Sequence, residues 1–163
     1  MTPDFLSPWT GLARTVCSRY SVVLEQVLAL IWQESAGNPR AYRFEQGFWA
    51  QYLDGRAEWT RGLTGAALES WIERCSASYG LMQIMFPTAC DHGLSPSAEP
   101  EFLFQPSMCL DYGIRHWKLC LTRAGGNVRD GFLRWNGGGR MAYADEAFDK
   151  LATLTAPPAG GTA

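Results

Sequence analysis

Apolar residues recur at helical spacing along most of the chain, and the clearest run lies between residues 24 and 35. Four of them stand at i, i+3, i+4 and i+7, the spacing of one helix face: Leu24, Val27, Leu28 and Ile31. Gly37 tolerates left-handed backbone angles, and Pro39 cannot continue a helix. The pattern therefore predicts a helix that ends near residue 36.

Glu34 is the informative residue of this predicted helix. The residues three, four and seven positions before it are all apolar, namely Ile31, Leu30 and Val27. A carboxyl placed on such a column is partly desolvated, and desolvation raises its pKa. A raised pKa suits a general acid that works near neutral pH. The alternative, a structural glutamate at a helix end that turns to solvent, stays open on this segment alone.

Further amphipathic runs predict helices over most of the remaining chain: 7–20, 66–75, 87–92, 106–123, 128–135 and 143–154. Segment 40–54 mixes aromatic and polar residues and is expected to be extended before a short helix, and 55–65 is expected to be an exposed excursion. Strand-like alternation is almost absent. We therefore expect one mainly α domain over residues 1–155, with at most a small β-hairpin, followed by a disordered tail rich in Pro and Gly over 156–163.

Length and charge narrow the range of functions. A chain of 163 residues fits one domain with a sizeable core. The formal net charge of −2 gives no electrostatic reason to expect nucleic acid or an anionic membrane as a partner. No apolar run is long enough to span a bilayer, and residues 1–9 lack the pattern of a secretory signal. We expect a protein made in the cytoplasm without a signal peptide, and a monomer.

Cysteine and histidine positions give no metal-ligand spacing. Five cysteines make an odd number with no Cys-x-x-Cys pair, so reduced and mostly buried thiols are expected. His92 and His116 are expected to have core or surface roles, and no metal or other cofactor is predicted. By contrast, seven tryptophans and six tyrosines exceed what a small core needs, and sugar-binding clefts use such rings as stacking platforms.

Three separated segments are informative together: Glu-Ser-Ala-Gly-Asn-Pro at 34–39, Ser-Tyr-Gly-Leu-Met-Gln-Ile at 78–84, and Leu-Arg-Trp-Asn-Gly-Gly at 133–138. Their order and content resemble the catalytic domain of soluble lytic transglycosylases, which share the lysozyme-like fold with goose-type lysozymes. The resemblance covers about residues 24–151. Each motif alone is weak, but three in order with a long predicted helix before the third form a specific signal.

The resemblance implies a role for Glu34 as the single catalytic acid and base. It would protonate the glycosidic oxygen between N-acetylmuramic acid and N-acetylglucosamine in peptidoglycan, and then take the proton of the muramic C6 hydroxyl as a 1,6-anhydro ring closes. One carboxyl suffices because the substrate supplies the nucleophile. The substrate-binding residues implied are Ser35, Tyr79, Met82, Gln83, Trp135, Asn136 and Tyr143.

Three of these positions also have ordinary structural interpretations. The Ser35 hydroxyl could bond back to a helix carbonyl, Met82 could fill the core, and an asparagine before three glycines, such as Asn136, often stabilises a turn.

The third motif departs from the family pattern. The family commonly has Ala-Tyr-Asn, with the tyrosine hydroxyl on the catalytic glutamate, whereas this chain has Arg134, Trp135 and Asn136. An indole offers an N–H donor but no hydroxyl. Tyr143 resembles a later tyrosine that faces the acid in related enzymes, and it is the candidate to supply the contact.

Glu45 is a candidate second acid, because goose-type lysozymes carry acidic residues after their glutamate that position water for hydrolysis. Asp54 is a weaker candidate, and an ion pair of Glu45 with Arg40 or Arg43 is the structural alternative. The resemblance therefore favours lytic transglycosylation. A hydrolytic muramidase remains the alternative, and a non-catalytic peptidoglycan-binding protein is a more distant one. Without a signal peptide, such an enzyme would reach the cell wall by another route, as a bacteriophage lysin or a secretion-system accessory does.

Overall fold

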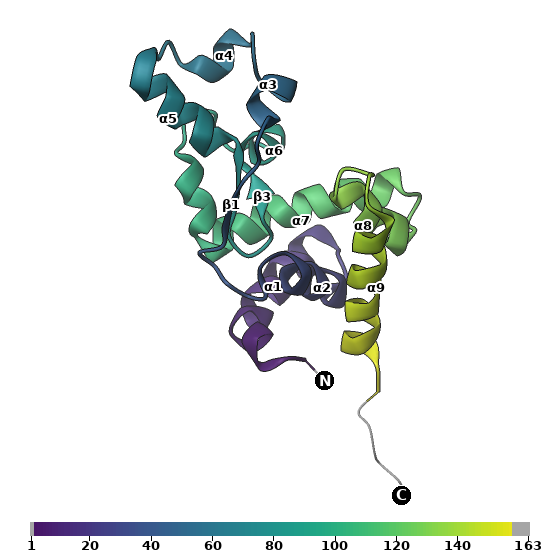
Figure 1. Cartoon of the computed structure of the whole chain (residues 1–163). Helices are drawn as coiled ribbons and strands as arrows, with labels where there is room; N and C mark the ends of the chain where they lie inside the picture. The colour runs from purple at the N-terminus through teal and green to yellow at the C-terminus, as the bar shows by residue number, and fades with distance from the viewer. Residues whose placement is uncertain (1, 158–163) are drawn as a thin grey trace, which may run out of the picture.

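Helices form nearly all of the regular structure in the computed structural model, which describes residues 2–157 (Figure 1). The predicted tail falls mostly on residues 158–163, outside the described residues. In chain order the elements are η1 (Asp4–Leu6), α1 (Ser7–Tyr20), α2 (Leu24–Ser35), β1 (Tyr42–Phe44), α3 (Phe48–Tyr52), α4 (Ala57–Thr60), α5 (Gly65–Cys75), β2 (Ala77–Tyr79), β3 (Ile84–Met85), α6 (Phe86–Asp91), η2 (Pro100–Phe104), α7 (Pro106–Arg123), α8 (Val128–Trp135) and α9 (Met141–Thr155).

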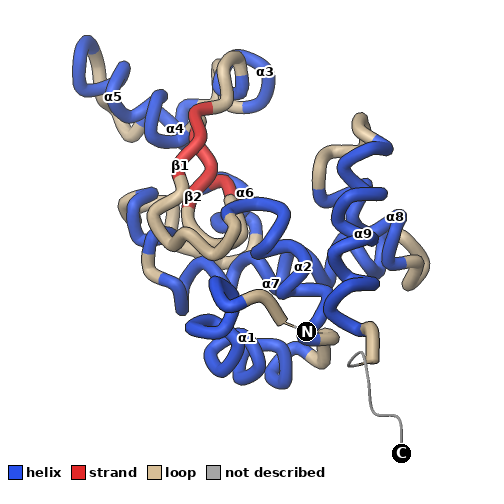
Figure 2. The backbone as a smooth tube through the Cα atoms, turned by 60° about the horizontal axis from the view of Figure 1, so that its bottom comes forward, coloured by secondary structure: helices blue, strands red, loops and turns tan. Residues whose placement is uncertain are grey.

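The elements gather into a helical body and a smaller lobe. In the body, α1 packs on α2 and α7, α8 packs on α7 and α9, and α9 lies along α2. The lobe holds α3, α4 and α5, and the strands connect it to the body (Figure 2). The long helix α7 runs from beneath the strands to α8 (Figure 1). No helix within residues 2–157 combines the length and apolar character needed to cross a bilayer.

A three-stranded antiparallel sheet replaces the single hairpin that was the most we expected. Strands β2 and β3 form the hairpin, and β1 adds a third strand with Arg43 opposite Ser78. Each strand has only two or three residues, too few to show an alternating pattern. The extended stretch predicted at 40–54 is thus confirmed, but its pairing into a sheet was not predicted.

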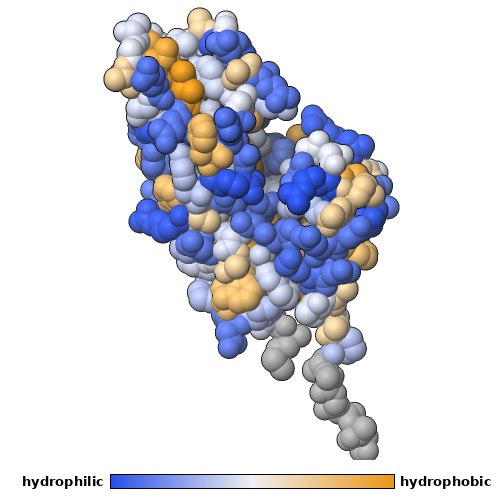
Figure 3. Space-filling model, in the orientation of Figure 1, coloured by the Kyte–Doolittle hydropathy of each residue, from blue (hydrophilic) through white to orange (hydrophobic). Residues whose placement is uncertain are grey.

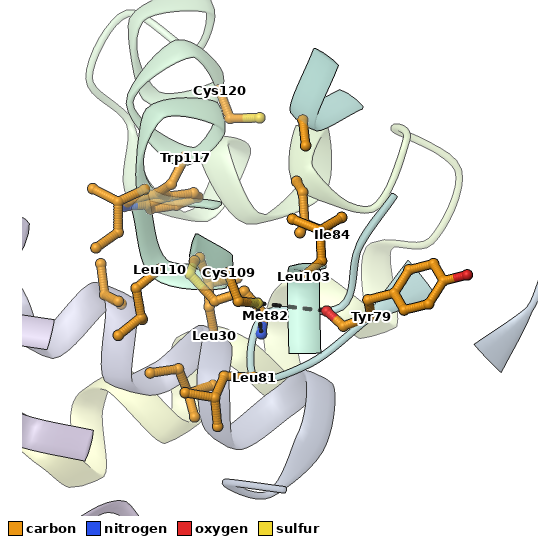
Figure 4. Close-up of a cluster of buried hydrophobic side chains, with 14 of the residues drawn as sticks. Leu30, Tyr79, Leu81, Met82, Ile84, Leu103, Cys109, Leu110, Trp117 and Cys120 are labelled. Carbon is orange, nitrogen blue, oxygen red and sulfur yellow. Dashed lines mark hydrogen bonds between the residues drawn. The ribbon is translucent and has the colours of Figure 1, made fainter. Parts of the chain in front are cut away.

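The core lies where α2, the β2–β3 turn and α7 meet (Figure 4). Leu30, Leu81 and Leu110 are fully buried there, and Trp117 of α7 stacks on Phe132 of α8 with ring centroids 4.8 Å apart. Gly80 has a φ of +69°, and a Cβ on it would lie 2.4 Å from a backbone carbonyl oxygen of η2. The turn can therefore pack this closely only with glycine at that position.

Two expectations about helix bounds need correction. The segment 55–65 is only partly an exposed excursion, because it contains α4, and Trp59 is buried against the ring of Phe86 at 6.1 Å. The last helix begins at Met141, two residues before the predicted start, which places Tyr143 in its first turn. This position matters because it aims the Tyr143 side chain at α2.

Candidate active site

Glu34 lies in the last turn of α2, where the helix ends as predicted. Ala36 caps the helix with left-handed angles, at φ 48°, and Gly37 continues the turn at φ 79°. A Cβ on Gly37 would lie 2.6 Å from the Phe5 carbonyl oxygen, so this glycine lets the N-terminal segment pack against the end of α2. The helix end thereby fixes where the Glu34 carboxyl points.

Two donors hold the Glu34 carboxyl. Trp135 Nε1 donates to Oε1 at 2.8 Å, and the Tyr143 hydroxyl donates to the same oxygen. The Oε2 atom has no hydrogen-bond partner among residues 2–157, so the proton of the acid form belongs on Oε2. Trp135, which stands where the third motif commonly has a tyrosine, therefore contacts Glu34 through its indole N–H. Tyr143, the later tyrosine, contacts Glu34 through its hydroxyl.

Burial sets the proton affinity of this carboxyl. Desolvation raises the pKa of Glu34 above its ordinary value, while the hydrogen bonds from Tyr143 and Trp135 act in the lowering direction and do not cancel it. Among the more distant charges, Arg43 lowers and Glu45 raises this pKa. The geometry and burial give Glu34 the properties of a general acid: a proton on an unengaged oxygen, and a conjugate base stabilised by two fixed donors.

Two hollows meet at Glu34. The Trp135 hollow, about 450 Å³, is lined by Trp135, Asn136 and His116 together with α3 and the β2–β3 hairpin. The Trp32 hollow, about 700 Å³, is lined by Trp32, Ser35, Asn38 and the segment 40–43. Both are lined by Glu34, Arg43 and Gln83, so together they form one groove past the carboxyl. Figure 3 shows the surface hollowed between the lobe and the part of the body that carries α8 and α9.

Gln83 and Ser35 line the groove, but their hydrogen bonds are made within the protein. The Gln83 amide nitrogen donates to the carbonyls of Ala41 at 2.9 Å and Gly80 at 3.1 Å, and its oxygen accepts from Ser78 Oγ at 2.9 Å. The Ser35 hydroxyl lies 2.8 Å from the Leu81 carbonyl and 3.2 Å from that of Ile31. Ser35 therefore bonds back to a carbonyl of its own helix, as its structural interpretation proposed. Both N–H groups of the Gln83 amide are used within the protein, so Gln83 holds the groove wall in place and has no free N–H for a ligand.

Tyr79 and Met82 lie in the core and line neither hollow, which corrects their expected placement in the cleft. Both are fully buried, and the Tyr79 hydroxyl donates to the Arg74 carbonyl at 2.6 Å. Met82 lies in the buried cluster beside Cys109 of α7 (Figure 4), and it packs against Gly113 of the same helix. Met85, three residues later, lines the Trp135 hollow instead. The two-residue strand β3 is too short to carry an alternation signal that could have identified Met85 from sequence.

Asn136 lies in the groove, where a residue that contacts a bound sugar is expected. It follows the last residue of α8, lines the Trp135 hollow, and its side-chain amide makes no hydrogen bond to residues 2–157. The amide is therefore available to a bound sugar. The glycines after it form the turn that leads to α9.

His116 lines the Trp135 hollow, a position that no pattern in the sequence predicted. Its ring lies 5.2 Å from that of Trp135, and its Nδ1 is 3.1 Å from His92 Nε2. Burial, together with the charge of His92, lowers the pKa of His116 to about 4, so the ring is neutral near pH 7. Within residues 2–157 no group of three or more His, Cys, Asp or Glu side chains is arranged to hold a metal ion.

The two candidate second acids differ in position. Glu45 lines the Trp135 hollow, and its Oε1 accepts from Arg43 Nε at 2.6 Å, which is one of the ion pairs that we considered as an alternative. Asp54 lines neither hollow and accepts from the Gly55 N–H at 3.0 Å. Glu45 therefore remains the one candidate near Glu34, and its part in hydrolysis stays a prediction. Phe48 also lines the Trp135 hollow.

Comparison with known proteins supplies the family. The sequence model of the transglycosylase SLT domain family matches residues 12–149 of the chain. The matched residues include α2, the sheet, α7 and α8. No curated protein and no solved structure matches the chain significantly. The match spans most of the chain and all three motifs, and it agrees with the mainly helical, lysozyme-like fold and with a function in peptidoglycan cleavage. The chain therefore belongs to the transglycosylase SLT domain family.

Proposed function

We propose that this protein cleaves the β-1,4 bond between N-acetylmuramic acid and N-acetylglucosamine by lytic transglycosylation, with Glu34 as the single acid and base. Family membership supports peptidoglycan as the substrate. The observation that carries the assignment of Glu34 is its place in the groove, with two donors on one oxygen and a pKa raised by burial. A groove that continues on both sides of the carboxyl suits a polymer that is cut internally.

The first step breaks the glycosidic bond. Glu34 passes its proton to the glycosidic oxygen as the bond to the anomeric carbon breaks, and the N-acetyl group of the muramic residue stabilises the positive charge left on that carbon. The carboxylate that forms is stabilised by the N–H of Trp135 and the hydroxyl of Tyr143, which already point at Oε1. These donors need no reorganisation at the moment when the charge appears.

The second step closes the ring and restores the acid. The C6 hydroxyl of the muramic residue attacks the anomeric carbon, and Glu34 takes the hydroxyl proton. The products are a 1,6-anhydro sugar and a free 4-hydroxyl, with no water consumed. The substrate supplies the nucleophile, so the chemistry requires only one carboxyl and no metal.

Hydrolysis is the second candidate, because Glu45 lines the same hollow as Glu34. Glu45 Oε1 accepts from Arg43 Nε at 2.6 Å, but its Oε2 accepts no hydrogen bond from residues 2–157 and can accept one from a water. The family match, and not this ion pair, favours transglycosylation. The two reactions differ in their products, a 1,6-anhydro end in one case and a reducing end in the other.

The test of the acid compares Glu34→Gln with Glu25→Gln, which removes a carboxyl from the first turn of the same helix and lies outside both hollows. We expect Glu34→Gln to lower the rate of clearing of a cell-wall suspension by ~10²–10⁴-fold, the usual contribution of a positioned acid and base. Glu25→Gln should keep the wild-type rate. A Glu34→Gln variant that retained more than about a hundredth of that rate would exclude the single-acid mechanism.

A further inference from the structure

Arg43 occupies the junction of the two hollows. It is the middle residue of β1, an exposed strand whose first residue, Tyr42, also lines the Trp32 hollow. Arg43 pairs with Ser78 of β2, which lines the Trp135 hollow, and Arg43 itself lines both hollows. The register of β1 on β2 thus places this guanidinium in the groove beside Glu34.

The hydrogen bonding of Arg43 leaves donors for a ligand. Its Nε donates to Glu45 Oε1 at 2.6 Å, whereas its two terminal nitrogens have no partner among residues 2–157. The side chain is 59% exposed, so a ligand can reach those nitrogens. A carboxylate is the natural partner of two parallel guanidinium N–H groups. The ion pair with Glu45 therefore orients the guanidinium while its outer edge stays open.

The charged side chains that line the groove indicate what this open edge can bind. Among the described residues, Arg43 is the only cationic side chain that lines the Trp135 hollow, whose carboxyl groups are Glu34 and Glu45. Arg40 is the other cation of the groove and lines the Trp32 hollow alone. N-acetylated sugars are neutral, and the negative charge of a peptidoglycan strand comes from carboxylates on its muramic residues. These are the lactyl carboxylate where the sugar is bare, and the carboxylates of the stem peptide where a peptide is attached.

We propose that Arg43 binds a carboxylate of the muramic residue and thereby selects peptidoglycan over neutral N-acetylglucosamine polymers. This inference rests on the proposed function for its substrate class. In this proposal Arg43 determines which glycan binds, and Glu34 alone carries out the proton transfers.

The test measures binding in a Glu34→Gln background, so that no ligand is consumed. Three ligands are compared: peptide-bearing glycan strands, strands stripped of peptides so that the lactyl carboxylate is bare, and neutral chitin oligosaccharides. Arg43→Gln is the test variant, and Arg56→Gln is the matched control. Arg56 forms the same type of pair, from its Nε to Glu58 Oε1 two residues later at 2.9 Å, and it lines neither hollow.

We expect Arg43→Gln to weaken binding of a carboxylate-bearing strand by roughly tenfold, as the loss of a charge-assisted hydrogen bond does. Binding of chitin oligosaccharides should not change, and Arg56→Gln should match the parent with every ligand. A loss with stripped strands identifies the lactyl carboxylate, and a loss confined to peptide-bearing strands identifies the stem peptide.

Equal losses for chitin and the charged strands, or no loss with any ligand, would overturn the proposal. These outcomes are separate from a failure of the proposed function, which would appear as a wild-type protein that binds the strands without cutting them.

Discussion

The Tyr143 hydroxyl gives the most specific prediction about the chemistry. Tyr143→Phe removes one oxygen atom, the donor to Glu34 Oε1, and leaves the ring in place. The residue is only 6% exposed, so water cannot readily replace the lost hydroxyl. The Trp135 indole N–H remains on the same oxygen. The variant therefore isolates one of the two donors that stabilise the carboxylate formed when the glycosidic oxygen is protonated.

The size of the effect follows from the charge on the acceptor. A hydrogen bond to a charged group contributes ~1.5–3 kcal/mol net, and one to a neutral group about 1 kcal/mol. The bond strengthens as the neutral Glu34 becomes a carboxylate, so the transition state loses roughly 0.5–2 kcal/mol more than the ground state. Each 1.36 kcal/mol is about a tenfold change in rate. We expect kcat to fall by roughly 10-fold, with little change in KM.

The pH profile gives a second readout of the same hydroxyl. Glu34 must carry a proton to act as the acid, so kcat/KM falls as pH rises through its pKa. The Tyr143 hydrogen bond lowers that pKa, and its removal raises the pKa further. The alkaline fall of kcat/KM should therefore move to higher pH.

The control is Tyr20→Phe, which removes a hydroxyl that donates to Asp111 Oδ1 at 2.7 Å, away from both hollows. It should leave kcat and the pH profile unchanged. The reasoning would be refuted if Tyr143→Phe kept the wild-type kcat, or if its alkaline limb moved to lower pH.

Three further predictions concern stability and the second acid. Glu34→Gln should raise the melting temperature near pH 7, because the folded state has a raised Glu34 pKa and disfavours the charged carboxyl. The gain should disappear in melts below pH 4.5, where the carboxyl is protonated in both states. Glu45→Gln should lower activity only modestly, through the lost pair with Arg43, and its products should keep 1,6-anhydro ends; abolished cleavage would point to a water-positioning role. Gly80→Ala should lower the free energy of unfolding in urea melts by ~3 kcal/mol or more, against ~1 kcal/mol for Gly125→Ala, which has a similar φ of +62° but open space around it. Equal losses for the two glycine variants would show that the close approach at Gly80 costs nothing.

Helix periodicity predicted the elements that carry the site. The helix that ends after Glu34, the long helix α7, and the short helix that ends at Trp135 all formed close to their expected bounds. These segments are amphipathic over two or more turns, so local sequence and burial agree. The desolvated environment of Glu34 also followed from its apolar neighbours in sequence.

The rest depended on contacts that sequence spacing does not encode. The strands are two or three residues long, and their pairing is set by the tertiary fold, so the placement of Met85 in the groove was not predicted. For Met82 the family resemblance implied the cleft, and the structure instead has the core position that the sequence offered as the alternative. His116 enters the groove because α7 passes beneath Trp135. Both donors to Glu34, Trp135 and Tyr143, had been named as candidates, but only the packing of α8 and α9 against α2 shows that the two act on one oxygen.

Mass spectrometry of the fragments released from purified peptidoglycan tests the central claim most directly. The wild-type protein should release muropeptides that end in 1,6-anhydro-N-acetylmuramic acid, and Glu34→Gln should release almost none. Fragments from the wild-type protein that end in free reducing sugars, with no anhydro product, would contradict the account.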